Sequence, residues 1–380
     1  MALVLGTCVA TASISVAAVV VNFPDSGLEA TIRDAIAKPT GDIYHIDLLG
    51  LTYLFADHNG GTELRISDLT GLEHCTNLTV LQLDGNEIAD LSSLEGLSKL
   101  VQLDLYRNQI VDVGPLSELT NLQRLDLSWN EIVSISQLSG LTSLVNLDLA
   151  GNPITDINPL SELTNLLSLN LHGIQIVDFS DLVRFTRLTW LNLSYAQVPE
   201  LGILTGLTDL EELYLSGNHI NDISPLAGLI NLTELSLSFN QIIDISPLAG
   251  LINLTTLYLS FNQIIDISPL AGLINLTTLY LGNNEIVDIS PLAGLINLTT
   301  LYLGNNEIVD ISPLAGLINL TTLYLGNNEI VDISPLADLA NLRRLDLGNN
   351  QLDLAPGSPN MLNIEALQDR GVDVSFDPQN

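Results

Sequence analysis

One phrase of 22 residues recurs along this chain and constrains its fold more than any other feature. The copy at residues 284–305, NEIVDISPLAGLINLTTLYLGN, returns letter for letter at residues 306–327, and thirteen copies fill most of the 380 residues. A fixed period of this length is typical of solenoids, in which each unit packs only on its neighbours. The period therefore predicts one elongated domain, and a stack of identical units makes a unique catalytic cleft improbable.

Each repeat predicts one strand and one tight turn. Two leucines flank a single residue, as Leu301 and Leu303 do, and this period-2 pattern indicates a short strand with the leucines inward. Strands one repeat apart should run parallel, roughly 4.8 Å apart. In the phrase Asp-Ile-Ser-Pro-Leu-Ala-Gly-Leu, Ser290 is an expected N-cap and Pro291 an expected first-turn residue. Too few residues remain for a full helix, so we expect a 3₁₀ turn on the convex side.

The segment before the array predicts an N-terminal cap. Ser26 and Glu29 match a capping box, and apolar residues with helical spacing follow until the Pro-Thr-Gly at 39–41. A first repeat needs such a cover for its exposed apolar end. Residues 51–72 then form a degenerate repeat, interrupted by His-Asn-Gly-Gly at 58–61.

After Leu354 the repeat pattern stops. Ser358 and the following proline predict the start of a helix that runs to Arg370, and residues 372–376 alternate like an edge strand. The predicted organisation is a leader at 1–21, an N-terminal helical cap at 22–50, the repeat array at 51–354 and a C-terminal helix–strand cap at 355–380.

The leader is apolar, with small-residue cleavage sites at 15–17 and 16–18. We interpret it as a secretory signal whose basic start is missing, because the first basic residue is Arg33. The alternative is a membrane anchor, since a span needs about 20 residues. After cleavage of a signal, we expect no membrane insertion.

Charge and cysteine content limit the partners. Lys and Arg number 11 against 44 Asp and Glu, a net charge of −33, which repels nucleic acid and anionic membrane surfaces. Cys75 occupies a repeat leucine position, so we expect a buried thiol, and no disulfide with Cys8. The cysteine spacing predicts no metal site.

The repeat phrase Leu-x-x-Leu-x-Leu-x-x-Asn-x-Ile-x-Asp-Ile-x-Pro-Leu-x-x-Leu resembles the 22-residue leucine-rich repeat of bacterial internalins. The opening Asn-Phe-Pro-Asp at 22–25 resembles the caps of related secreted proteins. The resemblance implies an α/β solenoid, a right-handed curved horseshoe with a concave parallel β-sheet, convex 3₁₀ turns and helical caps. It also implies a bacterial, secreted or cell-surface protein that binds another protein on its concave sheet.

Two polar columns follow the period. An asparagine stands at one fixed place in eleven repeats, replaced by Ile174 and Ala196 in two others, and we expect its amide to satisfy buried backbone groups. Ten aspartates and Glu200 form a second column. Each should accept backbone N–H groups of the turn that begins two residues later. Calcium is the alternative ligand, although a single file lacks converging oxygens.

Candidate binding residues lie between the strand leucines, where side chains point away from the core. The tyrosines predicted at this position are Tyr214, Tyr258, Tyr280, Tyr302 and Tyr324, with Ser236 in register. Tyrosine suits interfaces. The alternative is that these rings simply stack on one another after recent repeat duplication.

The N-terminal repeats vary more at the concave and adjacent positions, as a specific hot spot would require. Its predicted residues are Tyr106, Arg124, Trp129, His172, Trp190 and Tyr195. The patch includes the repeats that lost the column asparagine, which fits a functional site or, alternatively, decayed repeats.

We expect a binding protein with no catalytic role, no metal and no cofactor, because the five histidines are scattered and no hydrolase motif occurs. The expected partner is a protein ligand and the expected state a monomer. One alternative is carbohydrate binding through the tyrosines. Another is an intracellular regulator similar to the phosphatase-1 regulatory leucine-rich repeat proteins, which share the period.

Overall fold

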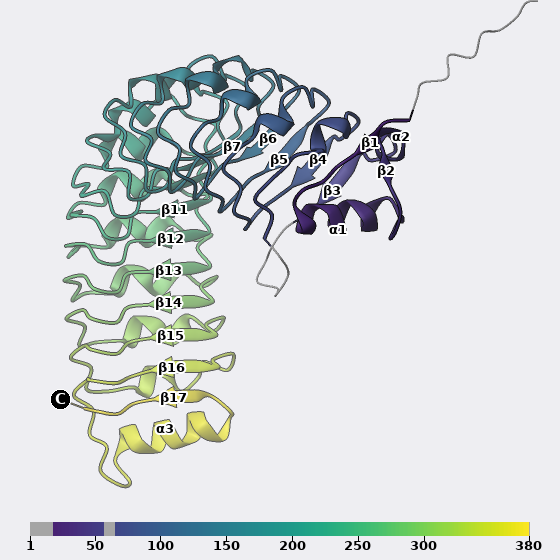
Figure 1. Cartoon of the computed structure of the whole chain (residues 1–380). Coiled ribbons are helices and arrows are strands. Elements are labelled where there is room, and N and C mark those ends of the chain that lie inside the picture. The colour runs from purple at the N-terminus through teal and green to yellow at the C-terminus, as the bar shows by residue number, and fades with distance from the viewer. Residues whose placement is uncertain (1–17, 57–64, 380) are drawn as a thin grey trace, which may run out of the picture.

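The repeats coil into a curved solenoid, seen in a computed structural model that describes residues 18–56 and 65–379. Its strands line the inner side of the curve, with α1 at the N-terminal end and α3 at the C-terminal end (Figure 1). Within the described residues, fifteen parallel strands form one sheet in chain order from β3 to β17. The predicted solenoid with a concave parallel sheet is confirmed. None of the helices in these ranges is long and apolar enough to cross a membrane.

The strands of the large sheet are three residues each, and most are centred on a buried leucine. They are β3 (Tyr53–Phe55), β4 (Val80–Gln82), β5 (Gln102–Asp104), β6 (Arg124–Asp126), β7 (Asn146–Asp148), β8 (Ser168–Asn170), β9 (Trp190–Asn192), β10 (Glu212–Tyr214), β11 (Glu234–Ser236), β12 (Thr256–Tyr258), β13 (Thr278–Tyr280), β14 (Thr300–Tyr302), β15 (Thr322–Tyr324), β16 (Arg344–Asp346) and β17 (Asp373–Ser375). The register pairs equivalent residues, so that Leu301 lies beside Leu279 and Leu323.

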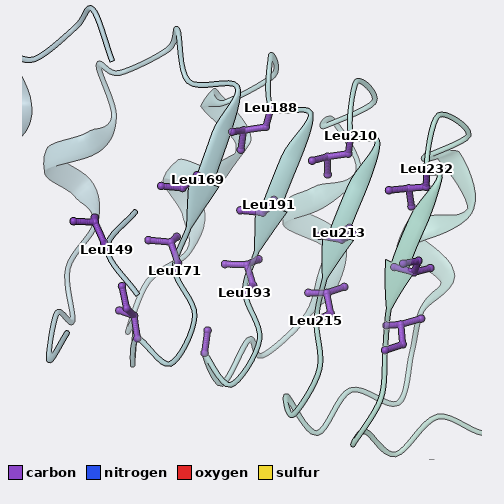
Figure 2. Close-up of a cluster of buried hydrophobic side chains, with 14 of the residues drawn as sticks. Leu149, Leu169, Leu171, Leu188, Leu191, Leu193, Leu210, Leu213, Leu215 and Leu232 are labelled. Atoms are coloured by element: carbon purple, nitrogen blue, oxygen red, sulfur yellow. The ribbon is translucent and has the colours of Figure 1, made fainter. Parts of the chain in front are cut away.

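Rows of leucines fill the interior. Leu191 and Leu193, like their equivalents one repeat away, are completely buried, and Figure 2 shows these side chains projecting from successive strands into one continuous core. Burial of each leucine contributes about 1.5–3 kcal/mol relative to exposure. Because every repeat buries its equivalent leucines, the core extends along the whole solenoid and is not a single globular core.

Short 3₁₀ helices occupy the outer side, as predicted (Figure 1). They are η1 (Leu72–His74), η2 (Ser92–Leu94), η3 (Gly114–Leu116), η4 (Ser136–Gly140), η5 (Asn158–Leu160), η6 (Ser180–Arg184), η7 (Leu201–Leu204), η8 (Ser224–Gly228), η9 (Ser246–Gly250), η10 (Ser268–Gly272), η11 (Ser290–Gly294), η12 (Ser312–Gly316) and η13 (Ser334–Leu336).

The prediction of Ser290 as the N-cap of its turn is wrong. The residue before η11 is Ile289, whose side chain cannot cap. Asp288 caps the turn instead: its Oδ1 accepts the N–H of Ser290 at 2.8 Å, and its Oδ2 accepts the Ser290 hydroxyl at 2.9 Å. A carboxylate accepts a hydrogen bond more strongly than a serine hydroxyl, so the aspartate takes the capping role.

The N-terminal cap contains β1 (Val20–Val21), α1 (Ser26–Ala35), β2 (Ile43–Tyr44) and α2 (His45–Leu48), with β1 and β2 antiparallel. The capping box at Ser26 is wrong by one residue, because Asp25 is the N-cap and accepts from the N–H groups of Gly27 and Leu28. Helix α1 also ends four residues before Pro39. Most of the leader, with Cys8, and the insertion at 58–61 lie outside the described residues.

Asp25 also ties this cap to the array. Its Oδ2 accepts the N–H of Ser67 at 2.9 Å, while its Oδ1 caps α1. Burial raises the pKa of Asp25, but these backbone hydrogen bonds outweigh it and hold the pKa below its usual range. One carboxylate therefore orients the helix over the first repeats.

The C-terminal end agrees closely with the sequence-based prediction. Ser358 is the N-cap of α3 (Pro359–Asp369), and its hydroxyl accepts the N–H of Met361 at 3.2 Å. Gly371 follows with φ +85°, a conformation that glycine adopts without strain. Strand β17 then pairs with β16 and extends the sheet beyond the last repeat.

Candidate ligand-binding surface

The repeated asparagines close the turn after each strand. In Asn306, Nδ2 donates to the backbone oxygens of Leu303 (2.9 Å) and Leu281 (3.1 Å), and Oδ1 accepts the N–H of Ile286 at 3.1 Å. The same three bonds recur at the equivalent asparagines, for example Asn130. Each amide thus closes the turn of its own repeat and joins it to the repeat before. The structural interpretation of this column is confirmed.

Ile174 and Ala196 have side chains that form none of these bonds. The backbone N–H of Ala196 still donates to Oδ1 of Asn218, one repeat later, at 3.1 Å, as the N–H of Asn218 does to Oδ1 of Asn240. Both side chains are completely buried, so they replace the polar tie with apolar packing. The two substituted repeats are therefore joined less tightly along this edge of the solenoid.

The aspartate column caps the outer turns. Asp310 Oδ1 accepts the N–H of Ser312 at 2.8 Å, and this backbone bond, with the serine hydroxyl, holds the pKa of Asp310 below its usual range. The predicted bond to the residue two positions later forms at Asp90, Asp112, Asp156, Asp178, Asp222, Asp244, Asp266, Asp288, Asp310 and Asp332. Glu200 differs, because η7 begins immediately after it, at Leu201. Nowhere in 18–56 or 65–379 do three or more His, Cys, Asp or Glu form a group that could hold a metal ion.

The predicted tyrosines on the C-terminal strands stack on one another. Ring centroids are 5.0 Å apart for Tyr258 and Tyr280, 4.1 Å for Tyr280 and Tyr302, and 4.3 Å for Tyr302 and Tyr324. Burial and the neighbouring hydroxyls raise the pKa of Tyr302. The interior rings use both faces in this stack, so they offer a ligand mainly their edges and hydroxyl groups. Sugars pack on free aromatic faces, so this geometry does not favour carbohydrate binding.

The concave face is hollowed over strands β4–β9, with a volume of about 450 Å³. Two predicted site residues, Arg124 and Trp190, line this hollow. Its other concave side chains are Gln82, Gln102, Asp104, Asp126, Asn146, Asp148, Ser168 and Asn170. The expectation that identical repeats leave no unique cleft does not hold here, because the residues beside the strand leucines change from strand to strand.

Three carboxylates stand in register in this hollow. Asp104, Asp126 and Asp148 lie side by side on β5, β6 and β7. Burial, together with the charge of Asp126 and against the opposing backbone hydrogen bonds, raises the pKa of Asp104 and of Asp148 to about 6. Asn170 Nδ2 donates to Asp148 Oδ2 at 2.8 Å.

The six ion pairs within the described part of the chain include neither these carboxylates nor Arg124. The hollow therefore keeps a negative charge that no protein cation pairs with. Such a surface attracts the positively charged groups of a partner and repels anions.

A row of exposed aromatic side chains borders the sheet. The residue before each asparagine-column position has left-handed backbone, and most repeats use glycine or asparagine there. Trp129, Tyr195, Phe239 and Phe261 instead adopt φ of 55–58°, which is rare and strained for a bulky residue. Their exposed fractions are 45–55%. The sequence-based prediction included Trp129 and Tyr195 but missed Phe239 and Phe261. Comparing the residue directly before the asparagine-column position in every repeat would have identified all four.

The structure brings some predicted residues together and separates others. His172 meets Tyr195 edge-on at 5.5 Å, and Trp190 lies 5.4 Å from Tyr214. Trp129 belongs to the row after the strands, whereas Trp190 stands on strand β9. Tyr106 follows β5, where the guanidinium of its neighbour Arg107 lies 5.8 Å from the tyrosine ring.

The family model for leucine-rich repeats, in units of two copies, matches this chain seven times. The matched residues are 76–118, 120–162, 142–184, 186–228, 230–272, 274–316 and 318–360. A solved internalin, inlF from Listeria monocytogenes, is 37% identical, with a TM-score of 0.80 over 86% of this chain and 96% of that one. The chain belongs to the internalin-like leucine-rich repeat proteins.

Two further solved structures support membership of this internalin-like family. The functional domain of InlJ from Listeria monocytogenes, described as including a cysteine ladder, is 25% identical, with a TM-score of 0.73, and the match covers 92% of this chain and 78% of that one. A leucine-rich repeat protein from Leptospira interrogans is 25% identical, with a TM-score of 0.71, over 88% of this chain and 93% of that one. No curated protein sequence gives a significant match.

Proposed function

We propose that this internalin-like chain is a secreted or cell-surface binding protein, without a catalytic role, that holds a protein ligand on its concave sheet. The observation that carries the proposal is the hollow with three in-register carboxylates, Asp104, Asp126 and Asp148. Partly buried like charges destabilise a fold. Such an arrangement persists most readily where the charges serve a function, as at binding sites.

The chemistry of the surface indicates the kind of ligand. The negative hollow suits lysine or arginine side chains, and the strained aromatic row beside it offers large, rigid contact areas. A protein ligand can satisfy both at once. The stacked tyrosines extend the contact surface but, with their faces occupied, give a sugar little to pack on.

Export fits this proposal. The predicted leader ends at residue 21, but its two candidate cleavage sites follow Ala17 and Ala18. Cleavage at either site would leave β1 (Val20–Val21) in the mature protein, paired with β2. Mass spectrometry of the mature N-terminus from culture medium or the cell surface would test this. A cytosolic chain that keeps Met1 would favour the intracellular regulator instead.

Binding is tested with a captured protein ligand and two double variants. Trp129→Ala with Trp190→Ala should abolish specific binding. Tyr280→Ala with Tyr302→Ala should weaken it by about 1 kcal/mol per residue. Neither pair belongs to the leucine core, so both double variants should still fold, although the tyrosine pair loses its ring stacking. The control is Ala293→Gln on the outer 3₁₀ turn η11. If that change alone abolishes binding while both double variants bind like the parent, the concave-face proposal is wrong.

A further inference from the structure

The tyrosine column between Tyr214 and Tyr324 is interrupted at Ser236. The register places Ser236 beside Tyr214 on one strand and beside Tyr258 on the next. Neighbouring strands lie about 4.8 Å apart, so the backbones of the two tyrosines that flank Ser236 are roughly 9.6 Å apart along the sheet. Farther along the column, rings one strand apart stack at 4.1–5.0 Å. The interval above Ser236, called the tyrosine gap below, is therefore one ring short.

The rings on both sides of the tyrosine gap lack an aromatic neighbour across it. Tyr214 contacts Trp190 on the preceding strand, and Tyr258 contacts Tyr280 on the following strand. The Tyr258 and Tyr280 rings are tilted by 35°, whereas the next two ring pairs are nearly parallel, at 12° and 14°. The stack therefore loosens at its end beside the gap.

The serine beneath the gap is satisfied where it is. Ser236 is buried, and its hydroxyl shares a hydrogen bond with the hydroxyl of Ser216 at 2.7 Å. No polar group of this serine therefore requires a partner from above. The Ser236 side chain below the gap is small, and its hydroxyl is already hydrogen-bonded. The flanking rings and carboxylates therefore determine which group the gap can bind.

Two glutamates stand beside the gap. Glu212 and Glu234 are neighbours in register on β10 and β11. The Tyr214 hydroxyl donates to Glu212 at 2.8 Å. Burial raises the pKa of Tyr214, and both glutamates raise it further, while Glu234 also raises the pKa of Tyr258 beyond the effect of burial.

The register places Glu234 on β11, between the strands that carry Tyr214 and Tyr258. Among residues 18–56 and 65–379, no ion pair involves Glu212 or Glu234. The gap thus combines two tyrosine rings with two carboxylates that no protein cation neutralises.

We propose that the tyrosine gap binds the guanidinium of an arginine side chain of the ligand, stacked between Tyr214 and Tyr258 and paired with Glu234. A guanidinium is planar, stacks on aromatic faces and pairs with a carboxylate through two parallel hydrogen bonds. A lysine ammonium is not planar. A neutral aromatic ring has the right thickness, but it would leave both carboxylates without a cation. The inference rests on the proposed function, because it names the group of the protein ligand that the concave face recognises.

The proposal is tested by filling the tyrosine gap with a tyrosine side chain. Ser236→Tyr restores the column residue of the following repeats, so the variant should fold, which the unfolding midpoint checks. The probe is the tripeptide acetyl-Gly-Arg-Gly-amide, with lysine and citrulline analogues, followed by Trp190 fluorescence in a Trp129→Phe background and by calorimetry. The parent should bind the arginine peptide at least threefold more tightly than the lysine peptide, and the citrulline peptide not measurably. Ser236→Tyr and Glu234→Gln should each weaken arginine binding at least tenfold.

Tyr302→Ser is the matched control, because it opens an equal gap beside Thr300 with no glutamate in that strand. In a Ser236→Tyr background this second gap should not bind the arginine peptide. The inference is overturned if Ser236→Tyr binds the peptide like the parent, or if the Tyr302→Ser gap binds it equally well.

A captured protein ligand separates the inference from the proposed function. Equal binding of that ligand to parent and Ser236→Tyr would overturn the inference and leave concave-face binding intact. Peptide binding that Ser236→Tyr removes, with ligand contacts mapped only to the outer turns, would show that the gap holds a guanidinium, but it would overturn the proposed function and the assignment of that arginine to the ligand.

Discussion

Gly151 lies directly under the indole of Trp129. A Cβ added at Gly151 would come within 2.9 Å of Cδ2 of that ring. Both residues have left-handed backbone, with φ of +66° at Gly151 and +55° at Trp129. The missing side chain in one repeat therefore sets the position of the exposed aromatic side chain in the repeat before it.

Gly151→Ala should displace Trp129 as well as strain the backbone. Gly173→Ala is the matched control, because it has φ +72° at the same repeat position and nothing within 4 Å of its added Cβ. Both should lose about 1 kcal/mol or more from the left-handed alanine. Only Gly151→Ala should shift the Trp129 emission, measured in a Trp190→Phe background. Equal spectra for the two variants would contradict the packing described for this pair.

Asn306→Ala should weaken folding and leave ligand binding unchanged. The change leaves the carbonyl of Leu281 and the N–H of Ile286 without the amide, which costs about 1–3 kcal/mol. Asn297→Ala is the control, since its amide makes one exposed bond, to Ile274. Urea denaturation followed by circular dichroism compares the two. Because each repeat packs only on its neighbours, the loss can also be seen as local fraying in hydrogen exchange. An unchanged midpoint for Asn306→Ala would refute the structural role.

Asp148→Asn should stabilise the protein at neutral pH. The pKa of Asp148 is raised from 3.8 to about 6, mainly by burial, so its ionisation opposes folding. The stability linked to this group is fully present below pH 3.8 and is lost as the pH rises through 6. The variant should match the parent near pH 3.5 and exceed it by about 1–2 kcal/mol at pH 7, after screening by solvent.

Asp310→Asn should show the opposite sign. Its pKa is lowered by the backbone bond to Ser312, so the stability it contributes is present above 3.8 and is lost as the pH falls through its lower folded pKa. Urea midpoints at several pH values measure both variants. If the parent instead became more stable than Asp148→Asn as the pH rises, the raised pKa assigned to Asp148 would be contradicted.

The thiol of Cys75 should be inert in the folded protein. It is completely buried, and burial, with the nearby charge of Glu73, raises its pKa to about 12, so the reactive thiolate is scarce at pH 8. A Cys8→Ser chain isolates this thiol. A thiol reagent should label it only in denaturant, and fast labelling of the native chain would show that the site is open.

Sequence reasoning reached furthest where one rule acts in every repeat. The Leu-x-Leu pattern predicted the strands, and the fixed place of residues such as Asn306 and Asp310 predicted their backbone bonds, because both follow from local spacing. The sequence-based predictions failed at single positions where neighbouring residues could each cap the same helix or turn. Asp25 displaces Ser26 as the helix cap and Asp288 displaces Ser290, since a carboxylate is the stronger acceptor in both places.

The candidate surface was predicted only in part. Arg124, Trp190 and the five tyrosines from Tyr214 to Tyr324 lie on the concave strands, as their place beside the leucines indicated. The carboxylates of Asp126 and Asp148 were missed, because a single strand does not show that like charges from separate repeats meet in register. Whether these residues bind the ligand stays a prediction.

The sequence by itself determined the solenoid, the parallel sheet and the outer turns of this protein, because a period of 22 residues forces equivalent residues into columns. The tertiary structure alone decided how those columns meet. Stacking of Tyr280 on Tyr302, the hollow over β4–β9 and the place of Trp129 above Gly151 all depend on contacts between repeats. Such contacts are set by strand spacing and curvature, which no single repeat specifies.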